Sequence, residues 1–230
     1  MKLSSFFIAL CFLLAPHFSY AQLNKKAQTA FKFAAKLQKS SRYEEALVEF
    51  QAIESNYPYS KYAKLAKLRI GDVHFAMKNY IQATYQYKYY HELYPREENS
   101  DYALFRAGLS QYKQMPKAID RDISQASSVL KTWRETLVKH PGTKYTDEIL
   151  KYQQKVIKKM GRKELYIAKF YHKQDRCISA QKRIQKLFRQ YPTFLKNSKA
   201  LKIAADCARQ LEDEPAERKY KELLKKAESA

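Results

Sequence analysis

The sequence predicts an all-α fold, a tetratricopeptide-repeat solenoid of about five helix pairs wound into a right-handed superhelix with a concave groove. Three observations support this fold class. The 230 residues include only 4 Gly and 7 Pro, which disfavours a fold rich in sheets and tight turns. Proline follows tyrosine or histidine at four points along the chain, Pro58, Pro95, Pro141 and Pro192. Small and bulky apolar residues precede these prolines at constant distances, as in tetratricopeptide repeats.

The chain begins with the pattern of a secretory signal peptide. Lys2 is followed by an apolar run at 6–14 and a small-residue cleavage site at 19–21. This order predicts cleavage after Ala21. The apolar run is too short for a bilayer span, which needs about 20 residues. We therefore assign residues 1–21 to a signal peptide and expect an exported protein.

The mature chain is strongly basic. The sequence holds 44 Lys and Arg against 23 Asp and Glu, a formal net charge of +21 at pH 7. Such an excess favours anionic partners, with an attraction screened over about 8 to 10 Å at ordinary salt. For an exported protein, an anionic membrane surface, lipopolysaccharide or an acidic protein is a more accessible partner than nucleic acid. We expect no nucleic-acid partner.

The repeat register is found by counting back from each turn proline. In three units, an alanine lies twelve positions before the proline and a bulky apolar residue lies eight positions before it. In the unit that ends at Pro141, these two positions hold Val129 and Trp133. The three regular pairs are Ala46 and Phe50, Ala83 and Tyr87, and Ala180 and Ile184. Small residues twelve positions before the alanines allow antiparallel helices to approach closely; these are Ala34, Gly71 and Ala168. Because one helix pair cannot bury its apolar face alone, the units must stack.

The register predicts five helix pairs, with a serine, Ser60, placed to cap the first helix of the second pair. The pairs are expected at 27–56, 60–93, 99–139, 144–190 and 196–228. Met115 to Arg121 is expected to form a surface loop inside the third pair. The stretch 143–171 is too long for one ordinary helix and predicts either an extra helix or a long bent one with a weak point at Gly161. This irregularity divides the repeats into an N-terminal part, 22–142, and a C-terminal part, 143–230.

Several phrases resemble the BamD family of outer-membrane protein assembly factors. They occur in the family's order over nearly the whole mature chain: Tyr-Pro-Tyr-Ser-Lys-Tyr-Ala at 57–63, Asp-Tyr-Ala-Leu-Phe-Arg-Ala-Gly-Leu-Ser at 101–110, Asp-Arg-Asp at 120–122, Pro-Gly-Thr-Lys-Tyr at 141–145 and Ile-Ala-Lys-Phe-Tyr at 167–171. The resemblance implies a non-catalytic adaptor without a cofactor on the periplasmic side of the outer membrane. Its partners would be a BamA-like barrel protein with its periplasmic domains, other assembly subunits and unfolded outer-membrane β-barrel proteins.

The resemblance also implies roles for two residues. Tyr62 matches a tyrosine after the first Tyr-Pro turn, in the substrate-facing part, and Arg183 matches an arginine linked to communication with BamA. Family members usually carry a lipidated cysteine at the end of the signal, whereas Ala21-Gln22 offers none here. We therefore do not expect a lipid anchor at this site, and we expect the basic surface to substitute for it in part by attraction to anionic headgroups.

Two other classes of function were considered. Another exported repeat adaptor, one that coordinates cell-wall synthesis or envelope constriction, has the same fold class, but the phrases at 101–122 favour the assembly factor. An enzyme would need a nucleophile motif, a phosphate loop or a second domain, and the sequence shows none of these. The histidines are scattered over different repeats without the spacing of a zinc site, so no metal site is expected.

Tyrosine is frequent, with 19 residues in the chain. Four crowd one predicted helix, and we expect Tyr87 and Tyr90 in the core and Tyr85 and Tyr89 at the groove. Rigid amphipathic rings bind extended peptides at low cost in conformational entropy. The basic residues Arg106, Arg121 and Lys113 are candidates to pair with the C-terminal carboxylate of such a peptide.

Two cysteines remain after export, Cys177 and Cys207. They are equidistant from the turn proline Pro192, and such residues lie side by side in an antiparallel helix pair. The exported compartment permits a disulfide between them. Helical phase leaves the alternative of two buried thiols, because Cys207 occupies a core position of the repeat.

Overall fold

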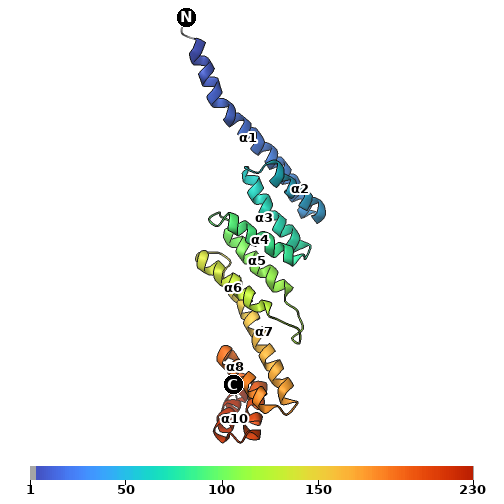
Figure 1. The fold of residues 1–230 in the computed structure, drawn as a ribbon, viewed down its shortest axis with the longest axis vertical. Helices are drawn as coiled ribbons and strands as arrows, with labels where there is room; N and C mark the ends of the chain where they lie inside the picture. Colours follow the sequence, from blue (N-terminus) through green and yellow to red (C-terminus); the bar gives the residue numbers. More distant parts are fainter. Residues whose placement is uncertain (1–3, 230) are drawn as a thin grey trace. The chain divides into compact units, whose positions relative to one another are not determined.

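The computed structural model describes the backbone of residues 4–229 and the side chains of residues 22–229. The predicted signal peptide, residues 1–21, lies outside the residues whose side chains are described. Within the described range the chain is helical and contains no strand (Figure 1). The elements are α1 (Ser4–Lys39), α2 (Tyr43–Asn56), α3 (Lys61–Ala76), α4 (Tyr80–Leu93), α5 (Ser100–Gln114), α6 (Gln125–Lys139), α7 (Thr146–His172), α8 (Cys177–Gln190), the 3-10 turn η1 (Pro192–Lys196), α9 (Ser198–Gln210) and α10 (Glu214–Glu228). The all-α, tetratricopeptide-repeat fold class is confirmed.

The helix ends agree with the predicted pairs to within two residues, except at the beginning. The first pair was expected to begin near residue 27, whereas α1 begins at Ser4 and is continuous into the repeat. The fourth pair has no extra helix, because α7 is a single helix of 27 residues that continues through Gly161. A loop separates α5, which ends at Gln114, from α6, which begins at Gln125.

Local chemistry explains where the helices begin. Ser60 Oγ accepts a hydrogen bond from the Ala63 amide at 3.1 Å and caps α3. Asn197 and Asp213 cap α9 and α10 in the same way. Each cap satisfies one of the amide groups that a helix N-terminus leaves without a partner.

The turn inside each regular pair uses the same backbone geometry. One non-glycine residue per turn adopts a positive φ between 54° and 63°; these are Ser41, Lys78, Asp175 and Glu212. The left-handed region is uncommon for such residues, so its recurrence indicates one turn design repeated four times. The third pair has the longer α5–α6 loop instead.

The contacts divide the chain into two compact units. Unit 1 contains residues 1–114 and 132–145, and unit 2 contains residues 115–131 and 146–230. The boundary passes through α6, so the α5–α6 loop belongs to unit 2. Neither unit contains a described helix that is long and apolar enough to cross a membrane.

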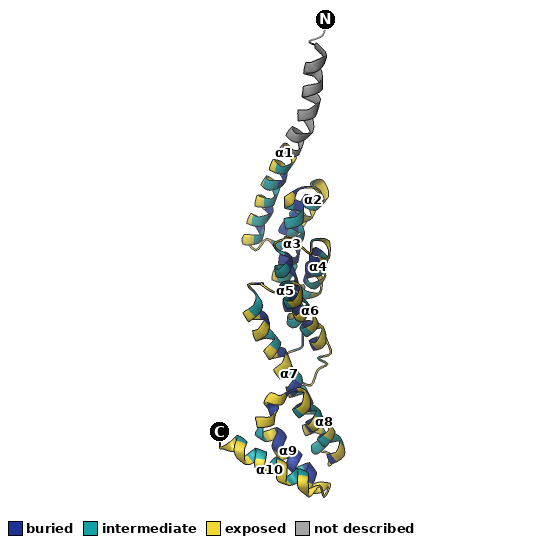
Figure 2. Cartoon of the chain, turned by 90° about the vertical axis from the view of Figure 1, so that its left-hand side faces the viewer, coloured by how far each residue is buried: buried dark blue, intermediate teal, exposed yellow. Residues whose placement is uncertain are grey.

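The core of unit 1 uses the residues that the register predicted. The predicted core residues of the first two helix pairs are almost fully inaccessible to solvent: Ala34, Ala46, Phe50, Ala83, Tyr87 and Tyr90. Gly71 of α3 faces the Tyr87 ring, and a Cβ there would lie 2.9 Å from Tyr87 Cε1. A side chain at this position would push the two helices apart. Buried residues line the inner sides of the helices, and exposed ones cover the outer sides (Figure 2).

Unit 2 packs α7, α8, η1 and α9 around a second core. Gly161 of α7 lies against the Phe194 ring, so its lack of a side chain serves close packing. Cys177 and Cys207 form a disulfide between α8 and α9, with their Cα atoms 4.9 Å apart. The last helix, α10, has no buried residue, and its Tyr220 is only half-buried against the core of unit 2.

Candidate partner-binding surfaces

A polar network joins α3, α4 and α5 in unit 1. Its centre is Asp72, which is 7% exposed. Asp72 Oδ1 accepts hydrogen bonds from the hydroxyls of Tyr87 at 2.6 Å and Tyr102 at 2.7 Å, and Oδ2 accepts one from Arg69 Nη1 at 2.8 Å. Burial and the adjacent Asp72 carboxylate raise the pKa of both tyrosines, so their hydroxyls remain protonated donors. The network fixes the mutual position of three helices.

Arg106 of α5 is attached to this network at one end. Its Nε donates to the Tyr87 hydroxyl at 3.1 Å, and its guanidinium carbon lies 3.8 Å from the centre of the Phe75 ring. The electrostatic influence of Tyr87 and Tyr102 raises the Arg106 pKa although burial opposes it. The two terminal Nη groups have no hydrogen-bond partner among the described residues. This planar group is positioned to bind a carboxylate through two hydrogen bonds.

The structure does not gather the three tyrosine candidates at one point of unit 1. Tyr62 is half-buried on α3 and packs against the Phe31 ring of α1, 5.6 Å between ring centres. Tyr85 and Tyr89 lie one turn apart on α4 with their rings stacked at 5.8 Å. Tyr85 is 63% exposed, whereas Tyr89 is half-buried beneath the Lys67 ammonium, 4.7 Å from its ring. Tyr62 therefore belongs in part to the core, and Tyr85 is the most accessible of the three.

The α5–α6 loop in unit 2 is attached to α7 by lysine side chains. Lys163 Nζ donates to three successive carbonyls, those of Ile119 at 3.0 Å, Asp120 at 2.8 Å and Arg121 at 3.0 Å. Lys159 Nζ donates in the same way to the carbonyls of residues 116 and 117. The Arg121 side chain is exposed on this loop. The sequence predicted the loop but not its contacts with lysines. The spacing of four residues between Lys159 and Lys163, which puts both on one side of α7, was an available signal.

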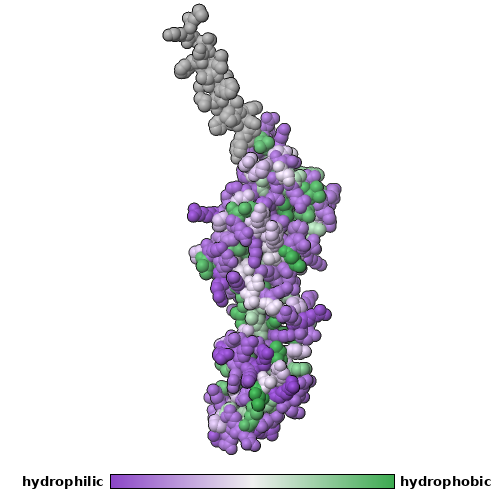
Figure 3. Space-filling model, viewed as in Figure 1, coloured by the Kyte–Doolittle hydropathy of each residue, from purple (hydrophilic) through white to green (hydrophobic). Residues whose placement is uncertain are grey.

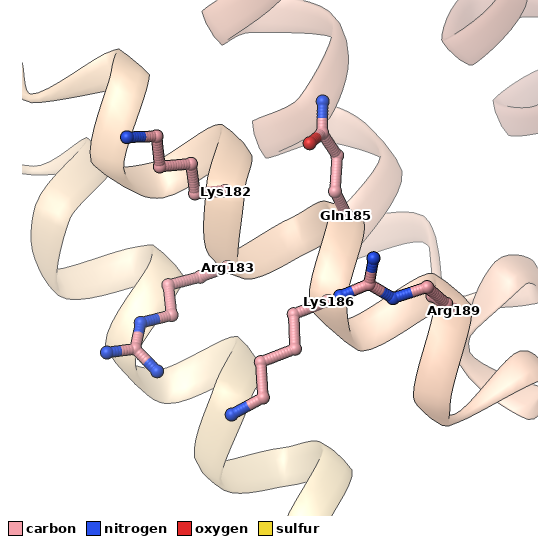
Figure 4. Close-up of a pocket in the computed structure, with 5 residues that line it drawn as sticks. All are labelled: Lys182, Arg183, Gln185, Lys186 and Arg189. Atoms are coloured by element: carbon pink, nitrogen blue, oxygen red, sulfur yellow. The ribbon is translucent and has the colours of Figure 1, made fainter.

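A basic pocket lies along α8 in unit 2. It has a volume of about 420 Å³ and is lined by Lys182, Arg183, Gln185, Lys186 and Arg189. Figure 4 shows the Arg183 and Lys186 side chains extending in the same direction, and Lys182 and Arg189 on either side of them. Four of the five lining residues are cations. The pocket is therefore suited to a carboxylate or another anion.

Glu164 of α7 balances part of this charge. Its carboxylate accepts from Arg183 Nη1 at 3.1 Å and from Lys186 Nζ at 2.6 Å, and the residue is 8% exposed. Arg183 was predicted from the sequence, whereas Glu164 was missed. A single acidic residue in the basic second half of α7 was the signal that could have identified it. Glu164 orients two cations while Lys182 and Arg189 have no ion-pair partner among the residues described.

The described side chains form no group of three or more His, Cys, Asp or Glu residues that could hold a metal ion. The candidate residues described above are cations and aromatic rings on helix surfaces. The surface in Figure 3 is largely hydrophilic, with hydrophobic residues in small separate groups.

Comparison with known proteins identifies relatives over most of the chain. The family model described as "YfiO: Outer membrane lipoprotein" matches residues 23–223. The outer membrane protein assembly factor BamD of Pasteurella multocida is 29% identical over 159 residues, which cover 65% of this chain and 61% of that protein. BamD of Neisseria meningitidis serogroup A is 24% identical over 161 residues, 66% of this chain and 60% of the relative. BamD of Vibrio cholerae is 22% identical over 92% of this chain and 88% of its own length.

The matches to the first two relatives span about three-fifths of their length. Among solved structures, a thermophilic tetratricopeptide-repeat protein of Thermus thermophilus is 14% identical with a TM-score of 0.40, covering 86% of this chain and 98% of that one. The family model alone covers most of the mature sequence. The chain therefore belongs to the YfiO family of outer membrane lipoproteins, the family of the BamD assembly factors.

Proposed function

We propose that this protein is a non-catalytic adaptor of outer-membrane β-barrel protein assembly, located on the periplasmic side of the outer membrane. The observation that carries the proposal is the family match over residues 23–223. The relatives are named outer membrane protein assembly factors. The helical repeats present polar and aromatic surfaces suited to binding.

Unit 2 docks on the periplasmic domains of a BamA-like barrel protein through the α8 pocket. Arg183 is the central residue, because Glu164 holds its guanidinium and the Lys186 ammonium in fixed positions. A partner carboxylate first meets Lys182 and Arg189, which have no ion-pair partner in the described part of the chain. It then meets Arg183 and Lys186, which Glu164 already orients. Orientation before binding reduces the entropy lost on association.

Unit 1 receives the substrate, an extended segment of an unfolded barrel protein. Tyr85 and Tyr89 supply stacked rings, and Tyr62 lies on α3 of the same unit. Arg106, held by Tyr87 through its Nε and by the Phe75 ring, binds the C-terminal carboxylate of an aromatic-ended peptide through its Nη groups. Arg121, on the α5–α6 loop of unit 2, is a separate candidate to bind a substrate carboxylate.

Docking is tested by mild crosslinking of the cell envelope followed by purification of the protein. We expect to recover a BamA-like barrel protein with the wild type and much less with Arg183→Ala. Arg189→Ala is a matched control in the same pocket, because Arg189 makes no ion pair among the described residues; it should lower recovery less. Recovery of wall synthases without any barrel protein would instead favour the alternative adaptor of cell-wall synthesis.

Substrate binding is tested with a peptide that ends in phenylalanine, once with a free C-terminal carboxylate and once amidated. We expect amidation to weaken binding to the wild type by about tenfold, as for loss of a charged hydrogen bond. Arg106→Gln should remove that difference, and Lys39→Gln, at an exposed lysine of α1 in the same unit, should preserve it. Unchanged peptide binding after replacement of both Tyr62 and Arg106 would rule out this surface.

A further inference from the structure

A stripe of cations runs along one side of α7 in unit 2. Its members are exposed and follow one another at intervals of three or four residues, with Tyr166 filling the longest gap. We call them the α7 basic face: Lys151, Lys155, Lys158, Arg162 and Lys169 on the helix, and Lys173 in the turn directly after it. These intervals keep side chains on one face of an α-helix. At 1.5 Å per residue the helical part of the stripe, from Lys151 to Lys169, is about 27 Å long. Exposed residues recur along α7 in Figure 2.

No acidic side chain interrupts the α7 basic face. Two acids of α7, Asp147 and Glu148, lie in its first turn before the stripe begins, and the third, Glu164, is buried against α8. Within the described residues, none of the six cations takes part in an ion pair. The attached α5–α6 loop carries two acids and two bases from residue 117 to 122, so it leaves the excess charge unchanged.

Two exposed aromatic residues lie within this basic region. Tyr166 is 43% exposed and Phe170, one turn later, is 51% exposed. The Lys163 ammonium lies 5.5 Å from the Tyr166 ring centre. Aromatic rings flanked by lysines are typical of surfaces that sit at the boundary between lipid headgroups and water, where long basic side chains reach the phosphates.

We propose that the α7 basic face binds the surface of an anionic membrane. Phosphate headgroups would surround the six cations, while Phe170 and the Tyr166 ring enter the headgroup layer. A long, continuous cationic stripe suits a planar array of anions better than one acidic protein, which would offer carboxylates over a shorter distance. Each lysine or arginine near such a surface contributes a similar increment of binding, so the whole stripe acts together. The proposal does not depend on the docking proposed above, because lipid vesicles contain no protein partner.

The test measures partition of the exported, processed protein onto vesicles of phosphatidylethanolamine with about 30% phosphatidylglycerol, compared with neutral phosphatidylcholine vesicles. The test variant carries Lys155→Gln, Lys158→Gln, Arg162→Gln and Lys169→Gln. The matched control carries Lys25→Gln, Lys26→Gln, Lys32→Gln and Lys36→Gln, which removes the same charge from exposed positions of α1 in unit 1. Both variants share the wild-type processing site, and circular dichroism checks their helix content.

We expect the wild type to bind anionic vesicles and to be released by salt, and the variant with four substitutions in α7 to partition about a thousandfold more weakly. The loss of partition free energy in the α1 control should be less than half of the loss in the α7 variant. Phe170→Ser should weaken partition further at high salt, where the electrostatic contribution is screened.

Three results would overturn the proposal. The first is equal loss with the α7 and α1 variants, which would mean that binding follows net charge alone. The second is equal partition of the wild type onto neutral and anionic vesicles. The third is unchanged vesicle binding by the α7 variant together with weakened binding to polyglutamate, which would make the face a site for acidic proteins.

Discussion

Tyr87 of α4 donates its hydroxyl hydrogen to Asp72 Oδ1 of α3 at 2.6 Å. The tyrosine is fully buried, and the same hydroxyl oxygen accepts from Arg106 Nε. One buried oxygen therefore connects the second and third helix pairs. The repeat register predicted Tyr87 as a core residue, but the hydrogen bond gives it a second role, because the substrate candidate Arg106 depends on it for position.

Tyr87→Phe removes this connection while keeping the ring. We expect a loss of about 1 to 3 kcal/mol in the free energy of unfolding, because Asp72 and Arg106 each lose a buried partner. Tyr85→Phe, at a hydroxyl on a 63% exposed residue, should change stability by less than about 0.5 kcal/mol. Urea unfolding of the two variants measures the difference. Equal stability would show that the network contributes little.

Gly108→Ala tests close packing between α5 and α6. A Cβ at this position would overlap the Trp133 indole, whose Nε1 donates to the Phe105 carbonyl at 3.2 Å. We expect destabilisation by about 1 to 3 kcal/mol from overpacking. Gly142→Ala is the matched control, because a Cβ there meets no atom within 4 Å and its φ is not positive. The expectation fails if the two alanine variants melt at the same temperature.

The disulfide between Cys177 and Cys207 should stabilise unit 2. It closes a segment with a sequence separation of 30, for which loop entropy corresponds to about 3 to 4 kcal/mol. We expect reductant to lower the melting temperature of the wild type and to have no effect on a Cys177→Ala, Cys207→Ala variant. Melting curves with and without reductant provide the measurement. A wild type that is insensitive although thiol titration shows full reduction would contradict the expectation.

His91 should titrate below the ordinary histidine pKa of 6.5. Burial lowers its pKa first, and the charges of Lys139 and His140 lower it further, against weaker opposite effects of Glu135 and Glu92. The folded pKa is below the unfolded one, so the unfolded state binds more protons and His91 makes unit 1 less stable as the pH falls below about 6.5.

Proton NMR of the histidine ring measures this pKa directly, with His91→Gln used to assign the resonance. The ring Nδ1 lies 2.6 Å from Ser100 Oγ, so the neutral form is held in a defined place. A midpoint at or above the ordinary histidine pKa would contradict the expectation.

Lys163 should hold the α5–α6 loop against α7. Lys163→Gln removes three hydrogen bonds to backbone carbonyls, and we expect trypsin to cleave faster after Lys117 and Arg121. Lys158→Gln is the control, because this lysine is exposed on the α7 basic face and does not anchor the loop. Mass spectrometry of the early fragments identifies the cleavage sites. Equal cleavage in both variants would mean that the loop is stable without its lysine.

The sequence by itself predicted the helix pairs and much of the core. Spacing from each turn proline placed Phe50 and Ile184 in the interior, because helical periodicity and the repeat length together determine which side chains face a neighbour. It also placed Cys177 and Cys207 at equal distances from a turn, while helical phase left their pairing open. Caps such as Ser60 were visible as well, since capping depends on adjacent residues.

Tertiary structure decided the contacts between side chains that are distant in sequence. Glu164 contacts Arg183 and Lys186 only because the packing of α7 against α8 places these residues opposite one another. Lys163 contacts three carbonyls only because the α5–α6 loop folds back onto α7. Such contacts depend on side-chain direction and helix approach, which composition and spacing do not specify. The sequence determined which surfaces are helical and basic, and the tertiary structure decided which charges are already paired and which remain available for a partner.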